Sequence, residues 1–166
     1  MAQVRSARGQ DIATLLALIR TTDGDAQGRW RLPVNRYGVL YLATLIVMVP
    51  IDFLFLGVVA KGFFASQVGD MLGEIRPAPA ILFYLLYVVG ILIFVSASAT
   101  ATWRSTLLYG ALFGFFCYAT FELTSLSLLK HWTWPVVIVD VAWGSFVTAL
   151  SSALGLTIAN WITPKI

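Results

Sequence analysis

The chain has 166 residues, of which 59% are hydrophobic and only 11% are charged, and its formal net charge is +3. A typical soluble domain has about 25% charged residues, and a chain of this size has too much surface to cover with so few charges. The composition therefore excludes a water-soluble globule and a disordered chain, and the single cysteine, Cys117, excludes an internal disulfide framework. The sequence predicts an integral membrane protein.

Residues 1–36 precede the first long apolar stretch and form a predicted N-terminal segment. Apolar residues at positions 12, 15, 16 and 19 fall on one helical face, and Asp11 can cap that helix. We therefore expect a short amphipathic helix over residues 11–20, lying on the membrane surface or on a partner. A loosely ordered tail remains the alternative. The apolar run is too short, and has no cleavage pattern, for a signal peptide.

Four stretches have the roughly 20 apolar residues that crossing a bilayer requires. They cover about residues 37–60, 79–98, 105–128 and 135–158. Because these runs are continuously apolar and do not alternate, they predict helices and not a membrane barrel. The expected fold is an all-α membrane protein, with residues 37–166 forming a bundle of four transmembrane helices.

The distribution of Lys and Arg predicts the orientation of the bundle. Lys61, Arg76 and Lys130 would lie on one side of the membrane. The opposite side has more basic residues: Arg5, Arg8, Arg20, Arg29, Arg31, Arg36, Arg104 and Lys165. Since basic loops are retained in the cytoplasm, we expect both termini to be cytoplasmic.

Three acidic residues lie inside the predicted spans, where a charge is costly and indicates a functional site by default. At about 1.5 Å per residue, Asp52, Glu122 and Asp140 lie about 12, 9 and 7.5 Å below the outer boundary. We therefore expect one polar layer in the outer half of the bundle, open toward the outside. Polar side chains expected near this layer are Tyr84, Tyr87, Thr120, Thr124 and Trp143.

No basic residue is expected in this layer, and three close carboxylates in an apolar medium cannot all stay ionised. The layer is accordingly interpreted as a proton relay, a cation site or a pocket for an amine or hydroxyl ligand. The structural alternative is that the acids only form hydrogen bonds that hold the helices together. No metal site and no cofactor are evident in the sequence.

The third span contains a G-x-x-x-G pair, Gly110 and Gly114. Small residues allow helix backbones to approach closely, so this pair predicts helix packing, within the bundle in preference to between protomers. The chain has no phosphate loop, dinucleotide fingerprint or nucleophile elbow. Its sparse basic residues give no reason to expect nucleic-acid binding.

Four segments resemble a bacterial family of small membrane proteins of unknown function. They read I-D-F-L-F-L-G around Asp52, F-Y-L-L-Y-V-V-G around Tyr84, Y-A-T-F-E-L-T around Glu122 and V-D-V-A-W-G around Asp140. In that family the third-helix motif more often reads Y-D-L-T-N, so Glu122 replaces an aspartate. The resemblance covers about residues 37–160. It implies four helices in the bacterial inner membrane and no particular activity.

Three functions stay open. The first is a noncatalytic accessory or structural subunit of a larger membrane complex or homo-oligomer, which the small size and the missing catalytic motifs favour. The second is a small transporter or a protein that binds a proton, cation or ligand at the acidic layer. The third, an enzyme acting on a lipid or isoprenoid, lacks an evident nucleophile, so the sequence favours a protein without enzymatic activity.

Overall fold

The computed structural model describes residues 36–71 and 73–164. The predicted amphipathic helix over residues 11–20 lies outside these residues. The helices described below belong to one compact unit, Tyr37–Ile166.

Four helices in the described part of the chain are long and apolar enough to cross a membrane: Arg36–Val59, Pro77–Ser96, Trp103–Leu128 and Trp134–Ile162. The described residues contain no strand. The predicted all-α fold with four membrane-spanning helices is therefore confirmed.

Two of the four spans end in a turn of π-helix. The first spanning helix (Arg36–Val59) ends in η1 (Phe55–Val59), and the second consists of α3 (Pro77–Ile91) followed by η3 (Leu92–Ser96). The third span is α4 (Trp103–Leu128) and the fourth is α5 (Trp134–Ile162). Helix α5 continues four residues beyond the predicted end at 158, because the polar Asn160 ends the apolar pattern without breaking the backbone helix.

Local sequence signals place the helix starts. Pro77 is at the first turn of α3, and Pro135 is at the first turn of α5, where a missing N–H costs nothing. Thr102 caps α4: its Oγ1 accepts a hydrogen bond from the Ser105 N–H at 3.2 Å, and the Ser105 Oγ accepts from the Thr102 N–H at 2.9 Å. This reciprocal capping box satisfies two amide donors that the helix itself cannot pair.

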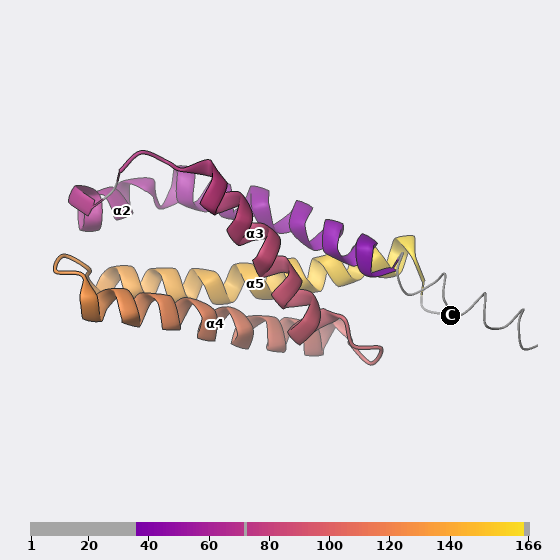
Figure 1. Cartoon of the computed structure of the whole chain (residues 1–166). Helices are drawn as coiled ribbons and strands as arrows, with labels where there is room; N and C mark the ends of the chain where they lie inside the picture. The colour runs from indigo at the N-terminus through magenta and orange to yellow at the C-terminus, as the bar shows by residue number, and fades with distance from the viewer. Residues whose placement is uncertain (1–35, 72, 165–166) are drawn as a thin grey trace, which may run out of the picture. The chain divides into compact units, whose positions relative to one another are not determined.

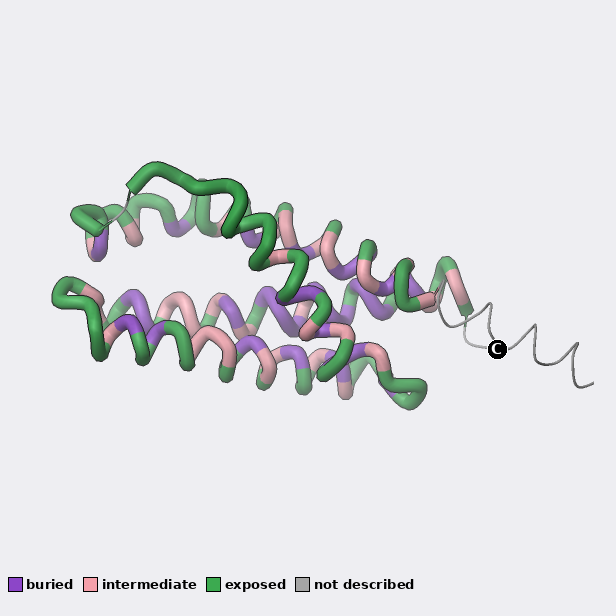
Figure 2. The backbone as a smooth tube through the Cα atoms, in the orientation of Figure 1, coloured by how far each residue is buried: buried purple, intermediate pink, exposed green. Residues whose placement is uncertain are grey.

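Helix α5 is the central helix of the bundle. Half of its most apolar window is buried, against 17–22% in the other three spans, and purple runs along its length in Figure 2. Helices α4 and α5 run side by side in opposite directions (Figure 1). They approach closely at two glycines of α4. A Cβ at Gly110 would meet the Ala149 Cα at 2.9 Å, and one at Gly114 would overlap the Gly144 carbonyl.

The first spanning helix and α3 pack against other parts of α5. Gly155 of α5 is in close contact with Thr44 of the first spanning helix. Met48, Val88 and Val147, one from each of the three helices, share a buried apolar cluster. Helix α3 crosses the bundle obliquely (Figure 1), so its second half enters the core while the first half, apart from Tyr84, is exposed.

The loop after the first span contains helical structure that the hydropathy pattern does not predict, namely α2 (Lys61–Val68) and η2 (Gly69–Met71). Two contacts join this loop to the α4–α5 connection. The Thr133 hydroxyl donates to the Gln67 side-chain oxygen at 3.0 Å, and His131 Nδ1 lies 3.2 Å from an Asp70 carboxylate oxygen. The two loops at this end of the bundle are therefore held together.

Candidate functional site: a buried carboxyl cluster

Asp52 is a buried carboxyl group with both oxygens paired. Its side chain is 2% exposed. One oxygen accepts a hydrogen bond from the Tyr84 hydroxyl of α3 at 2.8 Å, and the other accepts from the Trp143 indole N–H of α5 at 2.7 Å. The Trp143 ring also stacks on Phe55, with ring centroids 3.7 Å apart. Asp52 thus joins three spanning helices through one side chain.

Glu122 and Asp140 form the second part of the cluster. Glu122 is 1% exposed, and its Oε2 accepts a hydrogen bond from the Trp132 indole N–H at 2.7 Å. The partly buried Asp140 carboxyl group lies close to that of Glu122 and within electrostatic range of Asp52. Two carboxyl groups that lie close together in an apolar medium repel each other when both are ionised.

Helical spacing explains why these side chains meet. Residues three or four apart lie on the same helix face. This places Phe55 beside Asp52 on the first spanning helix and Trp143 beside Asp140 on α5. The three acids come from three different helices, and Asp140 lies within electrostatic range of both Glu122 and Asp52.

The cluster differs from the expected one at Tyr87 and in its access. Tyr87 hydrogen-bonds Thr148 at 2.9 Å and does not bond an acid, because it lies one turn deeper than Tyr84. The acids differ in their exposure to solvent, because Asp52 and Glu122 are buried whereas Asp140 is partly exposed. Trp132 covers Glu122 from the loop side, and its neighbours in the chain hold the α2–η2 loop in place.

The expectation that Thr120 and Thr124 line the cluster is wrong. Both residues are exposed, and their hydroxyls donate to the backbone carbonyls of Phe116 and Thr120. The physical reason is geometric. Each threonine is two residues from Glu122, about 200° around the helix, so a buried glutamate places both on the outer face.

The sequence analysis did not identify two residues of the cluster, Tyr118 and Trp132. Tyr118 lies within electrostatic range of Asp52 and Asp140, and its ring packs over Gly144 so closely that a Cβ there would overlap it. Its position four residues before Glu122 is the signal that could have identified it. Helical spacing could not identify Trp132, because this residue lies in the loop between α4 and α5 and reaches Glu122 only through that turn.

The three acids have no basic partner and form no cluster of metal-ligating groups among the described residues. No Lys, Arg or His of the described residues forms an ion pair with any of the three acids. Among the same residues, no three carboxylate, imidazole or thiol groups converge to hold a metal ion. The site consists of two neighbouring carboxyl groups and a third one within electrostatic range, in surroundings rich in indole and phenol groups.

A family model described as a predicted membrane protein (DUF2177) matches residues 37–157. This range is more than half of the chain and holds all three acids and the two glycines of α4. No curated protein and no solved structure matches the chain. By the extent of this match, the chain belongs to the family of predicted membrane proteins DUF2177.

Proposed function

We propose that this membrane protein binds a proton at the Glu122–Asp140 pair and exchanges it as a small transporter or proton-coupled binding protein. The close approach of these two carboxyl groups carries the proposal, because carboxyl groups side by side in an apolar medium cannot both stay ionised. Asp52 adds a neighbouring negative charge when it is ionised, and no basic side chain of the described residues compensates it. Ionisable residues inside membrane spans mark proton relays and ion or substrate pathways.

The Trp132 loop is the proposed route by which the proton reaches the pair. Trp132 covers Glu122 at one end of the bundle, and its neighbours His131 and Thr133 attach to the opposing loop. Opening this loop would bring water to Glu122 without unpacking α4 from α5.

Infrared difference spectroscopy of the full chain in phosphatidylcholine nanodiscs tests the proposal. A protonated carboxyl band is expected at neutral pH, and Asp140→Asn or Glu122→Gln should remove it. Both variants are nearly isosteric and keep an amide that can hydrogen-bond its former partner. Glu74→Gln, which changes an exposed loop acid, is the matched control and should leave the band intact. Absence of the band in the wild type, or its persistence in both variants, would refute the proton site.

Proton flux into dye-loaded proteoliposomes then separates transport from binding. Under an imposed membrane potential, the wild type should acidify the lumen, and Asp140→Asn should abolish this flux while the protein stays folded. A wild type with the carboxyl band and no flux would leave proton binding in place and refute the transporter.

A subunit of a larger membrane complex or homo-oligomer is the second candidate. It is supported by the exposed faces of three spans, whose most apolar windows are 78–83% unburied, although lipid covers such faces equally well. Native mass spectrometry after mild solubilisation from the host membrane tests it, because a subunit would migrate with a large assembly. We further propose the bacterial inner membrane as the location, with both termini in the cytoplasm.

A further inference from the structure

The loop between α4 and α5 is attached to the loop that follows the first span. His131 Nδ1 lies 3.2 Å from an Asp70 carboxylate oxygen of η2. Two residues later, the Thr133 hydroxyl donates to the Gln67 side-chain oxygen of α2 at 3.0 Å. Figure 1 shows α2 and the α4–α5 loop at the same end of the bundle. These two contacts hold the two loops against each other.

The residue between these two contacts faces the other way. An extended backbone, which Thr133 has at φ −120° and ψ 151°, directs successive side chains to opposite sides. His131 and Thr133 accordingly reach α2 and η2, whereas the Trp132 indole N–H reaches Glu122 of α4 at 2.7 Å. Because one short segment makes all three contacts, the loop cannot leave α2 and η2 without moving the backbone that carries Trp132.

The contact between His131 and Asp70 changes with pH in the neutral range. Histidine side chains usually change charge between about pH 5 and 8. Protonated His131 forms an ion pair with Asp70, whereas neutral His131 keeps at most a hydrogen bond through Nδ1–H. The two side chains are 64% and 61% exposed, and an exposed ion pair shifts an equilibrium by up to about fivefold. Acid at this end of the bundle should therefore favour closed loops.

The other charged groups of these loops give no competing contact. Asp70 faces His131 from η2, and Lys130 precedes His131 in its own loop. The remaining charged residues of the two loops form no ion pair in the described part of the chain: Lys61, Glu74 and Arg76. Carboxylates and amines usually titrate outside the range of about pH 5–8. A pH response that came from the buried acids would survive the removal of His131.

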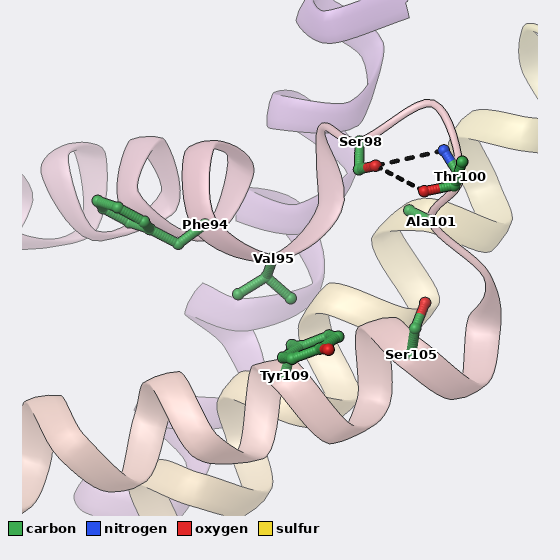
Figure 3. Close-up of a pocket in the computed structure, with 7 residues that line it drawn as sticks. All are labelled: Phe94, Val95, Ser98, Thr100, Ala101, Ser105 and Tyr109. Atoms are coloured by element: carbon green, nitrogen blue, oxygen red, sulfur yellow. Dashed lines mark hydrogen bonds between the residues drawn. The ribbon is translucent and has the colours of Figure 1, made fainter.

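The connection between η3 and α4, at the opposite end of α4, is built differently. Its hydroxyls bond within the connection, and Figure 3 shows the Ser98 hydroxyl bonded to the Thr100 hydroxyl and amide. Hydroxyl groups of this kind do not change charge near neutral pH. Val95 lines the adjacent cavity of about 230 Å³ and is 7% exposed. It therefore provides a buried control position at which no pH response is expected.

We propose that the contact between His131 and Asp70 is a pH-sensitive latch, which holds the α4–α5 loop on α2 and η2 more firmly when His131 is protonated. The latch is a property of the two loops, whatever the buried acids bind, and so goes beyond the proposed function. If protons also reach Glu122 through this loop, acid at this end slows their exchange, and this consequence alone rests on the proposed function.

Thiol labelling of the full chain in phosphatidylcholine nanodiscs measures how often the loops separate. In a Cys117→Ala background, Val68→Cys places a thiol at a residue of α2 that is 1% exposed, so this thiol reacts only when its cover moves away. Ala65→Cys, exposed on the same helix, reports the intrinsic reactivity of a thiol at each pH. The ratio of the two labelling rates with dithiodipyridine therefore follows the open fraction. We expect this ratio to rise about two- to fivefold from about pH 5.5 to about pH 8.

Four variants show whether the latch causes this rise. His131→Gln and Asp70→Asn each remove the ion pair, so the ratio should then be equal at the two pH values. Glu74→Gln, at an exposed acid beyond η2, is the matched control and should keep the full rise. Val95→Cys, in place of Val68→Cys, should show no rise. Circular dichroism checks that each variant stays folded.

Three results would overturn the latch. The first is a ratio that does not rise with pH when the loops are native. The second is a rise that survives in either His131→Gln or Asp70→Asn. The third is an equal rise at Val95→Cys, which would indicate loosening of the whole bundle. Because the infrared carboxyl band does not enter this test, the latch can fail while the proton site stands, and the reverse.

Discussion

Replacing Asp52 separates the role of its hydrogen bonds from the role of its charge. In Asp52→Ala, the Tyr84 hydroxyl and the Trp143 indole N–H both lose their acceptor in a site that is 2% exposed to solvent. Hydrogen bonds between membrane helices contribute about 0.6 kcal/mol on average and up to about 1.7 kcal/mol. Losing two of them should lower the free energy of unfolding by about 1–3 kcal/mol.

Asp52→Asn should cost much less. The asparagine oxygen can accept from the Trp143 N–H, and its amide can donate to Tyr84, whose hydroxyl rotates to accept instead. Both contacts survive and only the charge is lost, so we expect a change below about 0.5 kcal/mol.

Reversible unfolding in mixed detergent micelles, followed by circular dichroism, measures both variants. Glu74→Gln, at an exposed loop acid, reports the effect of an acid-to-amide change outside the bundle. If Asp52→Ala unfolds like the wild type, the two hydrogen bonds do not stabilise the fold. If Asp52→Asn costs as much as Asp52→Ala, stability depends on the charge and the reasoning from hydrogen bonds is refuted.

Three further predictions concern helix packing, side-chain exposure and topology. Gly114→Ala should lower the free energy of unfolding by about 1–3 kcal/mol, because the added methyl group meets the backbone of α5. The control is Gly38→Ala, which lies in open space on the first spanning helix and should be neutral or slightly stabilising. If the two variants change the free energy of unfolding equally, the close packing of α4 on α5 is contradicted. Thr124→Val should change stability by less than about 0.5 kcal/mol and leave the carboxyl band intact, since its side chain is exposed. In a cysteine-free background, an impermeant maleimide added outside intact cells should label Lys130→Cys and not Arg104→Cys; the reverse pattern would invert the proposed topology.

The sequence by itself determined the class of protein and its four spans. A long apolar run forms a helix in a bilayer, because every backbone amide must be paired within the segment. The depth of an acidic residue follows from the same reasoning, since helical rise is constant. For this reason the sequence alone predicts a similar depth for Asp52, Glu122 and Asp140.

Only the tertiary structure decided which side chains face one another. Helix rotation depends on the packing of neighbouring helices, and the apolar pattern of a membrane helix is too uniform to specify it. Thr120 and Thr124 therefore lie on the outer face, although their depth matches that of Glu122. Trp132 reaches Glu122 from a loop, where no periodicity predicts the direction of a side chain. The depth of a residue in the membrane follows from its position in the sequence. Which side chains face one another follows from helix packing, here from the close approach of α4 to α5 at Gly110 and Gly114.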